Sequence, residues 1–497
     1  MSLIQLKENI DAFQIYLVKS LDKSPINSNH ESTLKNLKFK CSFGSIIPLY
    51  EVKCMYVGTD YKNQFSTFDA FAKADYYKLG ANIIRILKKT LIRKIQINSL
   101  GNITSKQLEH FLLGLRQGGY DFDNYLKEKT SIELEIFLED RLSEVLEKSD
   151  LDYIESVTSG VKLARNLINE TPQVINPSTM PNIIHWEFSG SQNIEIGLVS
   201  YEKLIELGMN GIVDVGKASE HKPNLVHTIL NPKGEIKKKI VLVGKGLTYD
   251  SGGLDIKGGG HMRDMKSDMA GSATMFGVIK ALSSLDLHNT QVHWISAFAE
   301  NMIDSNAYKS DDILTTYSGL TVEIHNTDAE GRLTLADVLA YSTTLNPDYI
   351  VDAATLTGAC IVALSDNYTA LMSNDKSLSE KLLSKFELEL EPTSKVELRE
   401  NLRKYVKGNN SDLINTSTLE RQAGHMTAGL FLSHFVEQSQ FRNSDLKIES
   451  PKTFPWVHLD IAGSAFNPKH NSLGVNGATG QSIRSLVQWI LDEDKSI

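Results

Sequence analysis

Beyond about residue 239 the chain alternates short apolar runs with segments whose apolar residues recur at helical spacing. The alternating segments are KIVLVG (239–244), a helical pattern over about 268–284, VHWISAF (292–298), TVEIHN (321–326), LTLADVLAYSTTL (333–345), YIVDAATL (349–356), TAGLFLSHFVEQ (427–438), WVHLDIAG (456–463) and IRSLVQWILDE (483–493). Such alternation predicts a mainly parallel β-sheet covered by helices on both faces. In sheets of this kind, ligands collect beyond the carboxyl ends of the strands.

Residues 1 to about 150 have a different pattern. They mix short apolar runs such as FQIYLV (13–18) with helix-like stretches, of which SKQLEHFLLGLRQGGYDF (105–122) keeps its apolar residues on one face. The segment 127–150 is rich in both acidic and basic residues, so we expect a solvated helix face or a linker there. No dense cluster of His, Cys and carboxylates occurs, and we assign this part no chemistry. The pattern predicts a small α/β domain.

A helix is predicted to connect the two parts. The segment YIESVTSGVKLARNLINE (153–170) stops just before Pro172, as helices tend to do before a proline. We therefore expect an N-terminal α/β domain over residues 1–150, a connecting helix over 151–172 and a larger α/β domain over 173–497. A chain of 497 residues is too long for one ordinary core, which agrees with two domains.

Composition restricts the classes of partner. The net charge of −9 argues against nucleic acid as the main partner, because counterion release requires clustered Lys and Arg. No apolar run reaches the roughly 18 residues of a membrane span, and the N-terminal residues lack the basic and apolar blocks of a signal peptide. The cysteines, Cys41, Cys54 and Cys360, have no CxxC spacing, which fits a reducing compartment and argues against a cysteine-based zinc site. We expect a cytoplasmic protein.

Two stretches concentrate charge of both signs in glycine-rich surroundings. GKGLTYDSGGLDIKGGGHMRDMKSD (244–268) and NTDAEGRL (326–333) together contain five Asp, one Glu, three Lys and two Arg. Each stretch begins where a predicted strand ends, so both should reach the same edge of the sheet. Carboxylates gathered in one pocket repel and take up protons unless cations lie among them. Metal ions are the simplest explanation for this composition.

The charges balance for a pair of divalent ions. Four carboxylates, from Asp250, Asp268, Asp328 and Glu330, would neutralise two dications, and nearby Lys and Arg would leave a positive margin for an anion. Two such ions can share a water, lower its pKa and polarise a carbonyl, which together hydrolyse an acyl bond. The phosphate-binding patterns GxxxxGK[ST] and GxGxxG, a serine nucleophile elbow and an HExxH helix are all missing. Unrelated surface ion pairs are a poor explanation for so many charges at this spacing.

Lys245 must be neutral to bind a metal. Lowering its pKa from about 10.4 to about 7 costs roughly 4 to 5 kcal/mol, at about 1.36 kcal/mol for each pKa unit. An adjacent dication can drive that change, because a bound metal dominates the local proton equilibria. Without a metal, Lys245 is expected to be an ordinary ion-pair partner.

Three stretches resemble the signature sequences of the leucyl aminopeptidase family of dizinc metallopeptidases. They are VGKGLTYDSGGLDIK (243–257), MKSDMAGSATM (265–275) and NTDAEGRLTLAD (326–337), and NTDAEGRL is the hallmark of that family. The similarity runs from about residue 160 onward, through ARNLINETP (164–172), ATLTGAC (354–360), WVHLDIAG (456–463) and GATGQSIR (477–484). It implies a metal-dependent enzyme that hydrolyses N-terminal Leu, Met and similar apolar residues from peptides.

The resemblance also implies roles for single residues. Asp250 and Glu330 would bridge the two metal ions. Lys245 and Asp268 would complete one metal site, and Asp328 would complete the other through its side chain and its backbone carbonyl. Asp268 would also lie near the free amine of the substrate.

Further roles follow from the same resemblance. Lys257 would hold the carbonyl oxygen as it becomes negative, and Arg332 would hold a bicarbonate that acts as general base on the bridging water. The residues that would shape the first side-chain pocket are Met265, Asn326, Thr355 and Gly358. Leu356 would offer backbone contacts to the substrate.

Some positions depart from the family pattern. GGGHM follows Lys257, and His261 is either a solvated loop histidine or a loose third ligand. Ser310 and Asp311 stand where the family usually has Pro and Gly, and Ser365 stands where Gly is usual. These departures bear on side-chain preference and leave the charged residues intact.

The resemblance implies Zn²⁺ or Mn²⁺ as the pair of ions. Oxygen-rich ligation also admits Mg²⁺ or Co²⁺ at the site that lacks Lys245. A homohexamer is expected by resemblance alone. A second hypothesis is a nucleic-acid-binding regulator that retains the fold, for which KKTLIRK (88–94) is the only candidate basic run. An exposed helix end explains that run equally well.

Overall fold

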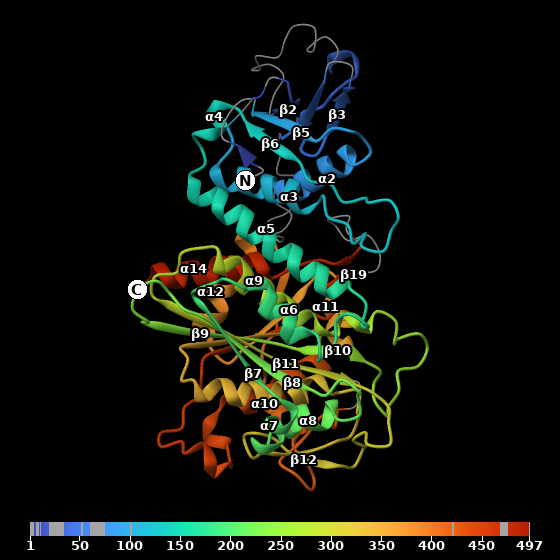
Figure 1. Ribbon diagram of the computed structural model, residues 1–497, viewed down its shortest axis with the longest axis vertical. Helices are drawn as coiled ribbons and strands as arrows, with labels where there is room; N and C mark the ends of the chain where they lie inside the picture. Colours follow the sequence, from blue (N-terminus) through green and yellow to red (C-terminus); the bar gives the residue numbers. More distant parts are fainter. Residues whose placement is uncertain are drawn as a thin grey trace. The chain divides into compact units, whose positions relative to one another are not determined.

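Figure 1 traces the chain of the computed structural model, which describes residues 4–5, 9, 11–18, 34–50, 53–59, 75–99, 102–419, 422–467 and 476–496. The chain divides into two units. The first comprises Met1–Thr158 with His470–Asn476, and the second comprises Ser159–Lys469 with Gly477–Ile497. The division falls inside α5 (Lys148–Asn169), the helix that corresponds to the one predicted over 153–170.

The first unit is built on a six-stranded sheet in the order β1-β6-β5-β2-β4-β3. Its strands are β1 (Ile4–Gln5), β2 (Phe13–Val18), β3 (Ile46–Leu49), β4 (Cys54–Gly58), β5 (Lys94–Ser99) and β6 (Glu135–Leu138). Only the β3–β4 pair is antiparallel among these described strands. The helices are α2 (Tyr76–Leu87), α3 (Ser105–Gln117) and α4 (Asp140–Ser143), and α2 packs against α3. The predicted α/β class of this part is confirmed.

The prediction for residues 127–150 was wrong. This segment contains β6, which pairs with both β1 and β5, and its residues Ile136, Phe137 and Leu138 are buried. The apolar residues of the strand are few and are flanked on both sides by charged residues, so the average composition of the segment did not reveal a strand. The acidic and basic residues lie at its ends, in the turns and in α4.

The second unit contains a nine-stranded sheet, in the order β16-β15-β18-β14-β9-β11-β8-β7, with β10 paired to β11. Its strands are β7 (Ile194–Val199), β8 (Asn224–Leu230), β9 (Lys238–Gly244), β10 (Gly246–Asp250), β11 (Thr290–Asn301), β14 (Tyr349–Ala354), β15 (Thr369–Ser373), β16 (Thr393–Lys395) and β18 (Trp456–Asp460). The centre, from β18 through β14 and β9 to β11, is parallel. Antiparallel pairs occur toward both edges. The predicted mainly parallel sheet is therefore confirmed.

Helices cover both faces of this sheet (Figure 1). They are α6 (Met180–Glu187), α7 (Tyr201–Glu206), α8 (Asn210–Gly216), α9 (Ala270–Ser283), α10 (Gly331–Thr344), α11 (Gly358–Leu364), α12 (Lys376–Leu388), α13 (Gly424–Ser433) and α14 (Ile483–Lys495). One face carries α9, α12 and α14, and the other carries α8 and α10, with α13 packed against α10. Val241 and Val243 of β9 belong to the core under α8 and α10. No helix in the described part of the chain combines the length and apolar character that crossing a bilayer requires.

The run 321–326 is not a strand of the main sheet. Only β13 (Thr321–Glu323) forms, in a three-stranded sheet with β12 (Ile313–Thr315) and β17 (Leu413–Ile414). The run is too short to cross the main sheet, and Val322 and Ile324 pack into the core beside it. The second charged stretch therefore enters the site from this small sheet. Two further short strands, β19 (Phe466–Asn467) and β20 (Gly477–Ala478), pair with each other.

Candidate metal centre

The first charged stretch lies at the carboxyl edge of the main sheet. Lys245 directly follows β9, and Asp250 ends β10, whose register places it opposite Asn301 at the end of β11. Asp268 lies in the 3₁₀ helix η3 (Met265–Met269), immediately before α9. The parallel centre of the sheet thus brings these side chains to one end, as expected for such folds.

The second stretch joins them there. Glu330 precedes the first turn of α10, and Asp328 lies in the loop before it. Asp250, Asp268 and Glu330 are buried, and each can place one carboxylate oxygen within 4.8 Å of the others. The side chain of Asp328 is 32% exposed and lines the same cavity. Carboxylates at such separations repel one another unless cations lie among them.

Lys245 is the buried cation of the cluster. Its Nζ lies 2.8 Å from Asp268 Oδ2 and 2.9 Å from Glu330 Oε1. Gly331 makes this approach possible, because a Cβ at that position would lie 2.2 Å from Lys245 Cε. The ion pairs match the expectation for Lys245 when it acts as an ordinary charged partner.

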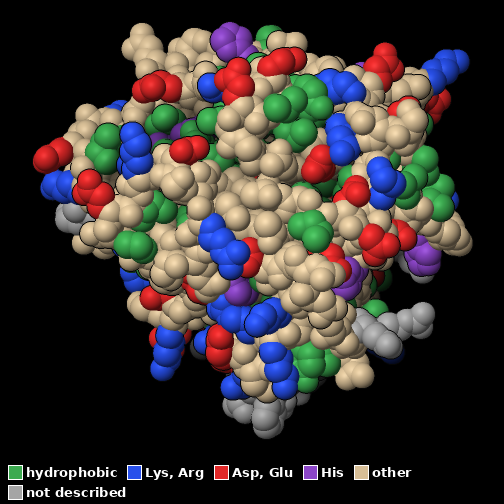
Figure 2. Space-filling model, turned by 90° about the horizontal axis from the view of Figure 1, so that it is seen from below, with side chains coloured by type: hydrophobic (Ala, Val, Ile, Leu, Met, Phe, Trp, Pro, Cys, Tyr) green, Lys and Arg blue, Asp and Glu red, His purple; other side chains and the backbone are tan. Residues whose placement is uncertain are grey.

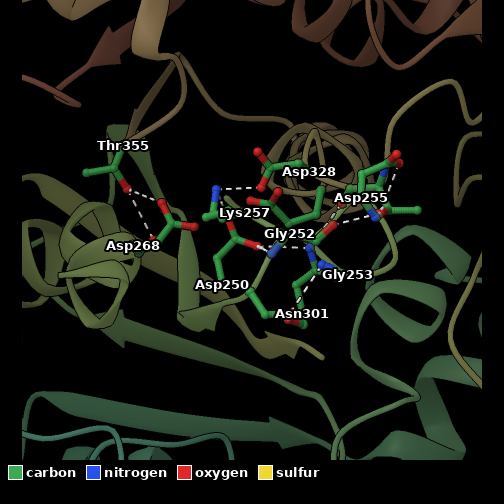
Figure 3. Close-up of polar contacts among 12 residues, drawn as sticks. Asp250, Gly252, Gly253, Asp255, Lys257, Asp268, Asn301, Asp328 and Thr355 are labelled. Carbon is green, nitrogen blue, oxygen red and sulfur yellow. Dashed lines mark hydrogen bonds and ion pairs between the residues drawn. The ribbon is translucent and has the colours of Figure 1, made fainter. Parts of the chain in front are cut away.

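Lys257 is the second cation (Figure 3). Its Nζ lies 2.7 Å from Asp250 Oδ2 and 2.5 Å from Asp328 Oδ1. Four carboxylates therefore share two ammonium groups, which leaves the cluster short of positive charge.

Three of the four carboxylates have raised pKa values. Burial, and then the charge of Glu330, raises the pKa of Asp250 to about 6. Burial also raises the pKa of Asp268 well above its usual value and raises the pKa of Asp328. For Glu330, burial acts in the same direction, but the two lysines outweigh it and lower its pKa. Three of the four carboxylates thus resist ionisation, chiefly because they are buried, and divalent cations among them would favour the ionised forms.

Lys245 fits a metal only under one condition. Burial acts to lower its pKa, but Asp268, Glu330 and Asp250 together hold the pKa above its usual value. As a ligand the amine must be neutral, and a neighbouring dication is the group that can displace its proton.

The charged residues line a cavity of about 520 Å³. The lining includes Lys245, Asp250, Lys257, Asp268, Asp328 and Glu330, the pocket residues Met265, Asn326, Thr355, Leu356 and Gly358, and also Asp255, Ile256, His261, Ile361 and Ala462. Thr355 Oγ1 donates a hydrogen bond to Asp268 Oδ1 at 2.8 Å (Figure 3). The backbone carbonyl of Thr355 accepts a bond from Lys245 Nζ at 3.0 Å, which ties the pocket wall to the charged cluster.

Arg332 is the exception among the predicted site residues. It lies in the first turn of α10, is buried, and is not among the residues that line the cavity. Burial lowers the pKa of Arg332 to about 10, opposed by the charges of Glu330 and Asp460. Its Nε has no hydrogen-bond partner within the described part of the chain. His261, in contrast, lines the cavity with an exposed side chain.

Residues 162–487 match the sequence model described as "Cytosol aminopeptidase family, catalytic domain". The chain belongs to this family. The family name covers the leucyl aminopeptidases that the sequence resembles, so that prediction is confirmed.

Relatives in the family cover most of the chain. The probable cytosol aminopeptidase of Persephonella marina is 37% identical over 433 residues, which are 85% of this chain and 83% of that one. The probable cytosol aminopeptidase of Sulfurihydrogenibium sp. is 34% identical over 504 residues, covering 96% of this chain and 92% of its own.

Solved structures of cytosol aminopeptidases and related enzymes share the fold. The crystal structure of the cytosol aminopeptidase from Coxiella burnetii has a TM-score of 0.81 and 27% identity, and it covers 99% of this chain and 100% of its own. The bottromycin maturation enzyme BotP in complex with Mn has a TM-score of 0.81 and 25% identity, covering 98% of this chain and 100% of its own. Membership in the family makes the protein a metal-dependent aminopeptidase, a hydrolase that acts on peptides and uses divalent metal ions.

Two departures from the aminopeptidase pattern lie at unusual backbone angles. Asp311 has φ of 73° and Ser365 has φ of 76°, both in the left-handed region that favours glycine. This explains why glycine is usual at these positions, and each side chain adds backbone strain here.

Sequence reasoning left several polar residues of this aminopeptidase site without a role. Asn301 Nδ2 donates to Asp250 Oδ1 at 2.9 Å and to the carbonyl of Thr327 at 3.0 Å. Thr327 and Asp255 lie inside the two charged stretches but carried no assigned role. The position of Asn301 at the carboxyl end of a predicted strand was the one signal that could have identified it.

Proposed function

We propose that the protein removes Leu, Met and similar apolar residues from the N-terminus of peptides by means of a water activated between two divalent ions. The observation that carries the proposal is the convergence of four carboxylates and Lys245 in one cavity that has too little positive charge. Two divalent ions would supply that charge, lower the pKa of a shared water and polarise the scissile carbonyl.

The geometry of the ion pairs supports the ligand roles that the family resemblance implies. Asp268 and Glu330 both reach Lys245, which supports these three residues as ligands of one ion. Asp250 and Asp328 both reach Lys257 Nζ, so their oxygens point to one place. We propose Asp250 and Glu330 as the bridging ligands, and Asp328 as the ligand that completes the second ion through its side chain and backbone carbonyl.

The identity of the ions is also a proposal. Zn²⁺ and Mn²⁺ suit the mixture of carboxylates with one neutral amine, and the structure of BotP was solved with Mn. Mg²⁺ or Co²⁺ would suit the second site, which has oxygen ligands alone.

We propose Lys257 as the group that holds the developing oxyanion. Burial acts to lower its pKa, but Asp250, Asp328 and Glu330 together outweigh burial and raise the pKa, so the side chain is charged at neutral pH. It lines the cavity beside the proposed ligands, where a fixed positive charge stabilises a carbonyl oxygen as it becomes negative.

Arg332 is proposed to hold a bicarbonate that acts as general base. A buried donor without a hydrogen-bond partner is costly, and Arg332 Nε has none within the described residues. A small anion bound to the guanidinium would relieve this cost and could take the proton of the attacking water.

The first side-chain pocket is proposed to consist of Met265, Asn326, Thr355 and Gly358, with backbone contacts from Leu356. A Cβ at Gly358 would meet nothing within 4 Å, so the wall is open at this point. Asp268 would lie near the free amine of the substrate and attract its positive charge. An apolar side chain of moderate length fits such a pocket.

Nucleic acid binding is not favoured. In the run 88–94, Lys88 pairs with Asp121 at 2.8 Å and Lys94 pairs with Glu135 at 3.0 Å. Figure 2 shows basic and acidic side chains interspersed over the face that it presents. A nucleic-acid groove requires unpaired basic residues gathered along one face.

We further propose, from the family resemblance, a cytoplasmic location and a homohexamer. Sedimentation velocity of the purified protein tests the assembly, and a monomer would contradict it.

The function is tested by hydrolysis of Leu-p-nitroanilide after chelation and after return of Mn²⁺ or Zn²⁺. The expected result is loss of activity on chelation, recovery with either metal, and two ions per chain by mass spectrometry of the metal content. Activity that survives complete removal of metal would contradict the proposal, and so would a preference for charged first residues across a series of p-nitroanilides.

A further inference from the structure

The two loops that supply the carboxylates are joined to each other by Asp255 and Thr327. The backbone N–H of Asp255 donates to Thr327 Oγ1 at 2.8 Å, and the backbone N–H of Thr327 donates to Asp255 Oδ2 at 2.7 Å. Thr327 Oγ1 donates in turn to the carbonyl of Gly252 at 2.6 Å. These reciprocal bonds connect segments that are distant in sequence, and we call them the Asp255–Thr327 clamp.

Other residues fasten the clamp to its surroundings. Ser310 Oγ donates to Asp255 Oδ2 at 3.1 Å. The carbonyl of Thr327 accepts bonds from Tyr308 Oη at 2.6 Å and from Asn301 Nδ2 at 3.0 Å. Thr327 is fully buried and engages its amide, hydroxyl and carbonyl groups at once, so its position is closely determined.

The clamp lies beside the proposed ligands in both loops. Asp255 stands between Asp250 and Lys257 in the chain, and Thr327 immediately precedes Asp328. Gly252 and Gly253 within the first loop have φ of 90° and 67°. A loop with such glycines has wide conformational freedom of its own. Bonds to the second loop therefore restrict the segment between Asp250 and Lys257.

We propose that Asp255 is a positioning residue that holds the two metal-ligand loops at the separation a bridged pair of ions requires. The inference rests on the proposed function. Asp255 contributes its side-chain oxygen and its amide to the clamp and does not reach the metal ligands in any hydrogen bond of the described structure. Each of the two ions would take ligands from both loops, so the binding of both depends on the clamp.

The contacts of Asp255 allow the role of its acceptor oxygen to be tested separately from the role of its negative charge. All side-chain bonds to Asp255 converge on Oδ2. Asn with its carbonyl oxygen in that place can accept the same bonds, so Asp255→Asn should retain the clamp, whereas Asp255→Ala removes it. Asp304→Ala is the matched control, because Asp304 is also an exposed loop carboxylate but bonds only within its own turn, to Ser305 and Asn306.

The test titrates metal-free full-length protein with Mn²⁺ by calorimetry and then measures kcat and KM on Leu-p-nitroanilide. Asp255→Ala is expected to weaken Mn²⁺ binding and to lower kcat, each by about 10- to 100-fold, the range for residues that orient metal ligands. KM should change little, because the first side-chain pocket is not touched. Asp255→Asn and Asp304→Ala should match the wild type.

Several outcomes would overturn the clamp. One is that Asp255→Ala keeps wild-type Mn²⁺ binding and kcat. Another is that Asp255→Asn loses as much Mn²⁺ affinity and kcat as Asp255→Ala, which would show that the negative charge of Asp255 matters and not its acceptor oxygen. A thermodynamic cycle adds Thr327→Val, and independent additive losses from Asp255→Ala and Thr327→Val would also contradict a shared clamp. Wild-type protein that binds no Mn²⁺ would overturn the proposed function itself, which separates that failure from a failure of the clamp.

Discussion

Two of the groups of buried charges in the second unit neutralise their charge in different ways. On adjacent strands β14 and β18, Asp352 Oδ1 accepts a bond from His458 Nδ1 at 2.6 Å, and Asp352 Oδ2 accepts one from Trp456 Nε1 at 2.7 Å. Both Asp352 and His458 are fully buried. Each oxygen of this carboxylate has a donor, and neither Asp352 nor His458 is among the residues that line the cavity of the candidate metal centre.

The metal centre is the opposite case. Its four carboxylates share two lysines and face a cavity of about 520 Å³. Burial of charge is therefore common to a structural ion pair and to a catalytic site. The distinguishing feature is whether the protein itself completes the neutralisation, and at the metal centre it does not.

The strongest test of this difference removes a proposed bridging ligand. Glu330→Ala is expected to abolish activity and to lose bound metal, because a bridging carboxylate serves both ions. Metal content by mass spectrometry and hydrolysis of Leu-p-nitroanilide measure the two effects. An inactive Glu330→Ala protein that keeps two ions per chain would contradict the bridging role.

Removal of the oxyanion partner should give the next largest effect. Lys257→Ala is expected to lower kcat by about 10²- to 10³-fold, as loss of one oxyanion donor does. Metal content should survive, because Lys257 is not a proposed ligand. Equal loss of metal would instead place Lys257 among the ligands, and Lys257→Arg is the control that retains the charge.

Loss of the ion pair between Asp352 on β14 and His458 on β18 should lower stability and leave metal content unchanged. His458→Phe leaves Asp352 buried without its cation, which costs about 3 to 5 kcal/mol in the free energy of unfolding. Activity per folded molecule and metal content should stay close to wild type. Loss of metal in this variant would show that the two groups of charges are not independent.

The stabilising contribution of His458 should also depend on pH. Burial acts to lower its pKa, but Asp352, with a smaller contribution from Asp460, outweighs burial and raises the pKa above the usual value of 6.5. Because the folded pKa is the higher one, the contribution is complete below about 6.5 and is lost as pH rises through the raised pKa. The difference in Tm between wild type and His458→Phe should be larger at pH 6 than at pH 9. An unchanged difference would contradict the ion pair.

A substitution in the uncharged wall of the first side-chain pocket should have the smallest effect on activity. Gly358→Leu places a side chain in open space at the wall of the cavity. The ratio of kcat/KM for Leu-p-nitroanilide to that for Ala-p-nitroanilide should fall by about 10-fold, the range for steric changes in apolar pockets. Gly358→Ala should leave the ratio unchanged, and an equal ratio in both variants would place the pocket elsewhere.

Much of the architecture could be predicted from the periodicity of apolar residues. The strands β9, β11 and β14 and the helices α9 and α10 lie within a few residues of their predicted positions. Long buried elements can be recognised from the sequence because their whole length is apolar or amphipathic. The failures, β6 and the run 321–326, are short elements that each pair with a strand far away in sequence, β6 with β1 and β13 with β17.

The sequence by itself determined which side chains are available for chemistry: the charged residues of the two stretches and the glycines that give the first loop its freedom. Their order in the chain does not determine which carboxylate meets which cation. Only the tertiary structure pairs Lys245 with Asp268 and Glu330, leaves Arg332 outside the cavity lining, and joins the loops through Asp255 and Thr327. The reason is physical, because hydrogen bonds and charge interactions act over a few ångströms, and the distances between remote segments are set by the packing of the sheet and its helices.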